Sequence, residues 1–183
     1  MYIRDEELIQ SYLNGEESAL RDLIARYFRV VYNFVRRYAG NGPDAEDITQ
    51  EVFVKVWKNL KRYDPKLSFR TWLFSIAKNS AIDWLRKKKA APLVSMDGDE
   101  TLSETLRDLA PLPDELVERN SASRAAANAI AKLSRGAQSV FSLRYRQDLT
   151  FRAIAESLGE PLNTVKSRHR RALAMLKKLL PES

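Results

Sequence analysis

The sequence contains no cysteine and a single histidine, His169, among 183 residues. Disulfide bonds, thiolate chemistry and the usual zinc ligand sets are therefore excluded, and the composition is compatible with a reducing compartment. No apolar run approaches the roughly 18 residues that a membrane span needs, and the first ten residues lack the features of a secretory signal. We therefore expect a cytoplasmic protein without stable membrane insertion.

The residue patterns that typify enzyme active sites are also missing. There is no glycine-rich phosphate loop, no metal-ligand spacing and no nucleophile paired with a base. His169 falls on the apolar side of its predicted helix, which favours a packing role over ligation or catalysis. We expect no enzymatic activity, no bound metal and no cofactor.

Charge is distributed unevenly along the chain. Residues 1–60 carry a net charge of −2 and residues 61–92 carry +7, whereas residues 93–118 carry −7 and residues 119–183 carry +9. Two basic regions separated by an acidic segment indicate a polyanion bound at two places, because a protein that needed only solubility would mix its signs. Ordinary solvated helix faces are the alternative interpretation of the same charges.

The acidic segment has the composition of a linker, with glycine, proline and weak hydrophobic periodicity. On both sides of it the apolar residues recur at helical spacing, and no stretch alternates as a strand would. The sequence therefore predicts an all-α protein with two small helical domains, residues 1–92 and 114–183, joined by a flexible acidic linker at residues 93–113.

In the first domain, helices are expected over residues 5–13 and 16–39, the second either continuous or broken near residues 28–30. A Gly-Asn-Gly-Pro break at residues 40–43 follows, and the acidic residues after it suit the start of a helix over residues 44–61. The inward positions of that helix are Ile48, Val52, Phe53, Val56 and Leu60. The outward positions are Asp47, Gln50, Glu51, Val54 and Lys58, with Trp57 near the edge of the apolar stripe.

Residues 61–89 interleave aromatic and basic side chains, a composition that single-stranded nucleic-acid sites use for base stacking beside phosphate contacts. Asp64-Pro65 marks a loop, and Ser68 can cap a helix running to about residue 89. The positions with the spacing of a buried stripe are Phe69, Trp72, Leu73 and Ile76. Tyr63, in the loop, is therefore the candidate for base stacking.

Farther along this helix, Asn79, Asp83 and Arg86 recur at i, i+4 and i+7. They share one side, from which an amide, a carboxylate and a guanidinium group could reach base edges. The alternative is an ion pair between Asp83 and Lys87, worth a few tenths of a kcal/mol.

The second domain is predicted to contain helices over residues 114–133, 136–147, 150–158 and 163–180. Gly159 suits the end of the third helix, and Asn163 can cap the fourth. Two helices joined by a short turn with glycine make a helix-turn-helix candidate, with Ile154, Ala155 and Val165 as its packing residues.

The last helix has one apolar and one basic side. The inward stripe is Val165, His169, Ala172, Leu173, Leu176 and Leu180. The outward residues near the N-terminal half are Lys166, Ser167, Arg170 and Arg171. That end of a recognition helix enters a major groove, and Arg168, which lies obliquely, can touch phosphate.

Three segments together carry a family resemblance that spans nearly the whole chain: DAEDITQEVFVKVWKNL, SFRTWLFSIAKNSAIDWLRKKK and LTFRAIAESLGEPLNTVKSRHRRAL. In this order, with an acidic connector, they resemble bacterial sigma factors of the extracytoplasmic-function group of the sigma-70 family. The resemblance implies a region 2 helical bundle and a region 4 helix-turn-helix. It also implies an alternative sigma factor that binds core RNA polymerase, through its β′ clamp and β flap, and directs promoter recognition, melting and initiation.

The resemblance assigns roles to particular positions. The residues matching the docking positions for core polymerase are Asp47, Gln50, Glu51 and Trp57. Those matched to the minus-ten element are Lys61, Arg62, Tyr63, Arg70, Asn79, Asp83 and Arg86. Those matched to the minus-thirty-five element are Thr164, Lys166, Ser167, Arg168, Arg170 and Arg171.

Further expectations concern partners. Promoter DNA and core polymerase are implied, and family members are commonly held inactive by an anti-sigma protein, which we also expect here.

The sequence departs from the family pattern at Arg135-Gly136-Ala137, where a proline-led helix start is usual, and at Arg170, where many members have histidine. The alternative function is a helix-turn-helix regulator that acts without polymerase, which would leave the outward face of the 44–61 helix unexplained.

Overall fold

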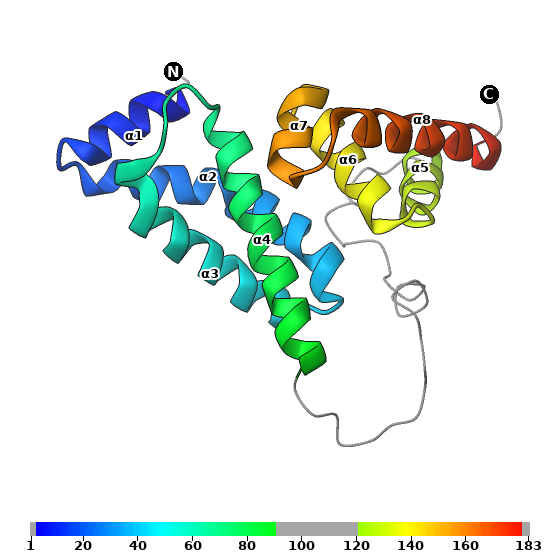
Figure 1. Ribbon diagram of the computed structural model, residues 1–183, viewed down its shortest axis with the longest axis horizontal. Helices are drawn as coiled ribbons and strands as arrows, with labels where there is room; N and C mark the ends of the chain where they lie inside the picture. Colours follow the sequence, from blue (N-terminus) through cyan, green and yellow to red (C-terminus); the bar gives the residue numbers. More distant parts are fainter. Residues whose placement is uncertain (1–2, 91–120, 181–183) are drawn as a thin grey trace. The chain divides into compact units, whose positions relative to one another are not determined.

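The computed structural model describes residues 3–90 and 121–180, and this part of the chain is helical without a β-strand. The N-terminal elements are α1 (Asp5–Leu13), α2 (Glu17–Ala39), α3 (Gly42–Asn59), the 3-10 turn η1 (Leu60–Arg62) and α4 (Phe69–Ala90). The C-terminal elements are α5 (Ser121–Ala131), α6 (Arg135–Tyr145), α7 (Phe151–Leu158) and α8 (Leu162–Leu179) (Figure 1). The predicted all-α class is confirmed.

Backbone contacts divide the chain into two compact units. The first contains α1 to α4, and the second contains α5, α6 and α8 with the beginning of α7. The predicted linker at residues 93–113, and the start of the helix expected from residue 114, lie outside the described residues. The predicted domain limits therefore stay predictions.

The core of the first unit forms around α2, which packs against α1, α3 and α4 (Figure 1). Val31, Phe34 and Val35 of α2 are almost completely buried. The ring of Phe34 lies edge-on to Phe74 of α4, with 5.2 Å between centroids. All five positions predicted to face inward, four in α3 and Leu60 in η1, are buried, because α2 and α4 cover that side of α3.

In the first unit the structure decides between the two alternatives for α2 and corrects the predicted start of α3. α2 runs through residues 28–30 without a break, since its buried positions keep helical spacing on both sides and no glycine or proline interrupts it. Gly40 ends α2 in the left-handed region, with φ of 87°. α3 begins at Gly42, two residues earlier than predicted, because the Asn41 side chain accepts a hydrogen bond from the Asp44 amide at 2.9 Å and Pro43 fits the first turn.

In the second unit, side chains from α5, α6 and α8 form one apolar cluster. Its buried members are Ala129, Leu133, Ala137, Ala172 and Leu176. Gly159 ends α7 with φ of 58°, as its type predicts. The predicted Asn163 cap is wrong: α8 begins at Leu162 behind Pro161, whose backbone occupies the capping position, so Asn163 lies within the first turn.

The two faces of α2 can be compared by the same substitution. Phe34→Ala should lower the free energy of unfolding by about 3–5 kcal/mol, because it leaves a cavity in the core. Phe28→Ala should cost only about 1 kcal/mol, since Phe28 is 41% exposed and has a stacked contact with Phe53. Urea unfolding followed by circular dichroism measures both, and similar losses would contradict the packing of α2.

Candidate functional site

The outward face of α3 is formed as the sequence predicts. Asp47, Gln50 and Glu51 are exposed, and their row continues along the helix to Val54 and Trp57, which are 46% and 52% exposed. Glu51 pairs with Lys55 at 2.7 Å. The face therefore combines carboxylates and an amide with two uncovered apolar side chains, which suits a partner surface that is basic and partly apolar.

A groove of about 530 Å³ borders Trp57 and is lined by residues of α1, α2 and α3. Leu20, Ile24 and Phe28 line its α2 side at intervals of four residues. The indole N–H of Trp57 donates to the Tyr12 hydroxyl at 2.9 Å, which fixes the exposed ring at the rim. Sequence reasoning missed this groove, although a second apolar stripe on α2 could have indicated it.

The loop between η1 and α4 is a compact turn with two exposed cations, Lys61 and Arg62, at its start. The Asp64 side chain accepts from the Lys66 amide at 2.9 Å, and its carbonyl accepts from the Leu67 amide at 3.0 Å. The Tyr63 hydroxyl donates to the Leu67 carbonyl and closes the turn. Ser68 caps α4 as predicted, because its hydroxyl accepts from the Thr71 amide at 3.2 Å.

Tyr63, the predicted stacking residue, belongs to a cluster of three rings. Its centroid lies 5.3 Å from that of Trp72 and 6.0 Å from that of Phe69. Burial raises the pKa of Tyr63 to about 12, and the carboxylates of Glu6 and Asp5 act in the same direction. The Tyr63 ring is only partly exposed to solvent. The three rings of Tyr63, Phe69 and Trp72 together lie beneath the loop, and we call this cluster the loop floor.

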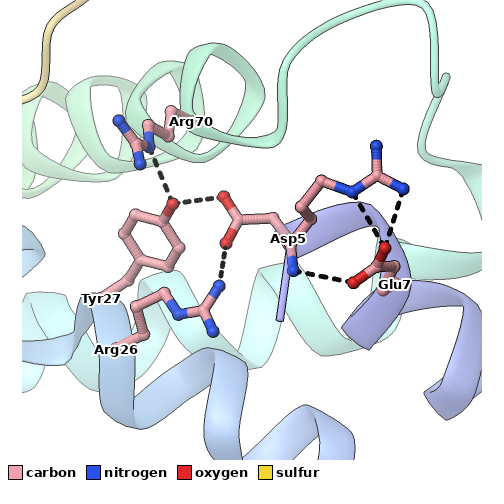
Figure 2. Close-up of polar contacts among 6 residues, drawn as sticks. Asp5, Glu7, Arg26, Tyr27 and Arg70 are labelled. Carbon is pink, nitrogen blue, oxygen red and sulfur yellow. Dashed lines mark hydrogen bonds and ion pairs between the residues drawn. The ribbon is translucent and has the colours of Figure 1, made fainter. Parts of the chain in front are cut away.

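Arg70, in the first turn of α4, is bound within the protein (Figure 2). Its Nε donates to the Tyr27 hydroxyl at 2.9 Å, and that hydroxyl donates to the carboxylate of Asp5. The other Asp5 oxygen accepts from Arg26 at 2.6 Å. Burial, reinforced by the hydrogen bond to Asp5, raises the pKa of Tyr27. The sequence reasoning that grouped Arg70 with DNA-facing cations did not detect this network.

Asn79, Asp83 and Arg86 are exposed along α4. Arg86 lies 3.8 Å from Asp83, so the ion pair forms at i, i+3, whereas the sequence alternative placed Lys87 there. Trp72 and Ile76 are partly covered, while Phe69 and Leu73 are buried. The predicted polar side of α4 is thus confirmed as solvent-facing.

The basic side of α8 is also formed. Lys166, Arg170 and Arg171 are exposed, whereas Ser167 is partly buried and donates its hydroxyl proton to the Thr164 carbonyl at 3.0 Å. Thr164 is itself partly buried.

Leu173 was predicted to face inward, and this is wrong, because it is 42% exposed. Ala172 and Leu176, four residues apart, occupy the core-facing line of α8 instead. Successive residues of an α-helix are rotated by about 100° around the helix axis, so Leu173, which follows Ala172, points toward solvent.

Arg168 differs from Lys166 and Arg170 because it is partly buried and forms an ion pair within the second unit. Its Nη1 lies 2.6 Å from the Glu160 carboxylate, and the two side chains are 26% and 28% exposed. The guanidinium group also lies against α6, so that a Cβ atom at Gly136 would be 2.9 Å from its central carbon. Gly136, one of the positions at which the sequence departs from the family pattern, therefore leaves room for Arg168. The Arg168 side chain links α8 to α6 and to Glu160 in the turn between α7 and α8.

His169 has the packing role predicted for it. Its ring stacks beside Tyr145 at 5.7 Å and meets the edge of Phe151 at 4.9 Å. Its Nε2 lies 3.0 Å from the Tyr145 hydroxyl oxygen. Burial, together with the charge of Arg144, lowers the pKa of His169, which favours the neutral ring in this contact.

Within residues 3–90 and 121–180, no group of three or more histidine, aspartate or glutamate side chains could hold a metal ion. Within the same ranges, no helix is both long and apolar enough to cross a membrane.

Comparison with known proteins gives matches in both units. The family model for Sigma-70 region 2 matches residues 23–91, and that for Sigma-70, region 4 matches residues 129–178. The ECF RNA polymerase sigma factor SigW of Bacillus subtilis (strain 168) is 33% identical over 94% of each chain. RNA polymerase sigma factor YlaC of the same strain is 31% identical over 90% of this chain and 94% of its own.

Two solved structures share the fold. CnrH, in complex with the cytosolic domain of CnrY, aligns with a TM-score of 0.61 at 23% identity over 96% of each chain. The sigma factor RpoE of Bartonella quintana, in complex with the anti-sigma factor NepR, aligns with a TM-score of 0.63 at 18% identity. That alignment covers 87% of this chain and 94% of RpoE.

The structural role of Arg168 can be tested against an exposed cation on the same helix. Arg168→Met should lower the free energy of unfolding of the second unit by roughly 1 kcal/mol, because it removes a partly buried ion pair, whereas Lys166→Met should change it by at most a few tenths. Thermal unfolding gives both values. In a double-mutant cycle, Arg168→Met and Glu160→Gln should be non-additive, and additive losses would contradict the pairing.

Proposed function

The chain belongs to the extracytoplasmic-function (ECF) group of RNA polymerase sigma factors, in the sigma-70 family, and we propose how its two units share promoter recognition. It is an alternative sigma factor, a non-enzymatic partner of RNA polymerase in transcription initiation. The observation that carries the proposal is the pair of exposed faces: a largely acidic and amide-bearing face on α3, and a basic face near the start of α8. The first suits a protein partner, and the second suits DNA.

α3 docks the first unit on core polymerase. Asp47, Gln50 and Glu51 meet basic groups of the β′ clamp coiled coil, and Trp57 supplies an aromatic contact held at a fixed angle by Tyr12. Exposed carboxylates steer association with a positive surface, whereas the aromatic ring adds binding energy once it is covered.

The loop between η1 and α4 captures an unstacked base of the minus-ten element. Lys61 and Arg62 are placed beside the loop to hold phosphates, and the rings of Tyr63, Phe69 and Trp72 form its floor. Opening the duplex costs about 1.4 kcal/mol per base-pair step, so capture of flipped bases offsets part of the cost of melting. The polar residues placed to contact the upstream edge of the element are Asn79, Asp83 and Arg86.

α8 reads the minus-thirty-five element. Lys166 and Arg170, one turn apart on the exposed side, are the candidates for base edges in the major groove. Arg171 and Thr164 are suited to phosphate contacts. Ser167 is partly buried and lies between these two residues and the pair Lys166 and Arg170 on the surface of α8. Arg168 sets the angle of the helix through Glu160 rather than contacting DNA.

Two further partners complete the proposal. The second unit contacts the β flap of polymerase, and an anti-sigma protein holds the free protein inactive. The solved RpoE structure, a complex with the anti-sigma factor NepR, supports this form of regulation. A reducing cytoplasm is the compartment in which these partners meet.

Docking through α3 is tested by transcription in vitro. Core RNA polymerase supplemented with this chain should initiate at discrete sites in a genomic promoter library. Asp47→Lys should weaken holoenzyme formation by about tenfold, because it places a cation against a basic partner, and should reduce initiation accordingly.

Asp22→Lys is the matched control, since Asp22 is an exposed carboxylate on α2 outside the α3 face. It should leave core binding within about twofold of the wild type, because surface charges away from an interface contribute little. If Asp22→Lys and Asp47→Lys weaken core binding equally, α3 is not the docking face. If the chain starts no transcription and binds promoter DNA alone, the polymerase-independent regulator describes it better.

Base reading by α8 predicts a loss that depends on sequence. Lys166→Ala or Arg170→Ala should each weaken binding to a mapped promoter by about 1–3 kcal/mol while leaving core affinity unchanged. Arg171→Ala should instead weaken binding to all DNA sequences alike and make it less sensitive to salt. Fluorescence anisotropy at several salt concentrations separates the two, and an equal loss on unrelated DNA would refute base reading by Lys166 or Arg170.

A further inference from the structure

The carboxylate of Asp5 binds a buried hydroxyl in the interior of the first unit (Figure 2). Tyr27 is only 3% exposed, and its hydroxyl joins α1 to the first turn of α4 by donating to Asp5 and accepting from Arg70. Asp5 is itself held by Arg26, with side chains that are 11% and 23% exposed. Three helices therefore meet at one hydroxyl group.

The ring of Tyr27 connects this polar junction to the loop between η1 and α4. It lies edge-on to Phe69, with 5.5 Å between centroids, and Phe69 in turn packs against Tyr63 and Trp72. Phe69 and Arg70 are consecutive residues, so Tyr27 contacts the start of α4 through both its ring and its hydroxyl. The position of the loop floor thus depends on Tyr27.

α1 supplies one residue of this polar junction, Asp5, which lies outside the residues that match the family model for region 2. The Sigma-70 region 2 model matches residues 23–91, which include Tyr27 and Arg70 but not Asp5. The carboxylate that fixes the Tyr27 hydroxyl therefore comes from a helix beyond the match. A buried hydroxyl that loses its acceptor is left unsatisfied, so the contact constrains where α1 and Tyr27 sit.

We propose that Asp5 and Tyr27 are positioning residues for capture of the melted minus-ten strand. Asp5 orients the Tyr27 hydroxyl, Tyr27 holds Arg70 and Phe69 at the start of α4, and these set the floor on which Tyr63 and Trp72 lie. A displacement of about 1 Å at a binding surface can cost a large factor in function even when the mutated residue is remote from it. The inference rests on the proposed role of the loop.

The experiment measures strand capture by the holoenzyme. The probe is a fluorescent single-stranded oligonucleotide carrying the minus-ten sequence mapped for this protein by transcription in vitro. Asp5→Leu and Tyr27→Phe should each weaken its binding by about five- to tenfold, since each nearly keeps the shape of the side chain and removes the hydrogen bond between positions 5 and 27. Core affinity should stay at the wild-type value, because α3 and its face are untouched.

Three controls separate positioning from general stability. Glu7→Gln removes the charge of an exposed carboxylate on α1 that pairs with Arg4 at 2.8 Å, and this variant should bind the strand as the wild type does. The double variant Asp5→Leu/Tyr27→Phe should be no weaker than Tyr27→Phe alone, because the two residues act through one hydroxyl. All measurements are made at a temperature where circular dichroism shows each variant fully folded.

The outcomes distinguish the inference from the function on which it rests. If the wild-type holoenzyme does not hold the single strand, the proposed role of the loop is wrong and the inference falls with it. If the wild type holds the strand and the folded variants match it, or if their losses add, the loop keeps its role and the positioning by Asp5 and Tyr27 is refuted.

Discussion

Packing of α2 against its three neighbours is the constraint on which the first unit depends. Val31, Phe34 and Val35 fill the interior between α3 and α4, so the apolar side of α3 must turn inward and its acidic row must face solvent. The same helix places Tyr27 beneath the start of α4. One buried stripe therefore sets both the proposed polymerase-binding face and the floor of the proposed strand-binding loop.

Basic side chains of α4 and α8 include some that bind other groups of the protein and others that stay exposed, which we propose are available to a partner. Arg70 and Arg168 are engaged by Tyr27 and Glu160, whereas Lys166 and Arg170 extend from the solvent side of α8. An ion pair that is partly buried fixes a helix angle, while an exposed cation keeps its charge available for phosphate or base edges. Positively charged side chains thus either stabilise the fold or stay available for binding. Their hydrogen bonds and ion pairs in the structure show which of the two applies.

In the proposed function the two units carry out complementary steps, so each DNA-binding surface can be weak by itself. Neither the loop of the first unit nor the basic face of α8 then needs high affinity alone, because polymerase bound to both units makes the second DNA contact effectively intramolecular. The net charges of +7 and +9 in the two basic regions favour DNA, and the −7 of residues 93–118 is repelled by it.

The sequence by itself determined the helical class, the inward and outward sides of α3, the Ser68 cap and the left-handed end at Gly159, because periodicity and capping are local properties. Only the tertiary structure decided that α2 is continuous, that Leu173 faces solvent, and that Arg70 and Arg168 bind Tyr27 and Glu160. It also revealed the Asp5 to Tyr27 contact, which joins residues 22 positions apart. Such contacts depend on which helices meet and at what angle, and local sequence patterns do not encode that angle.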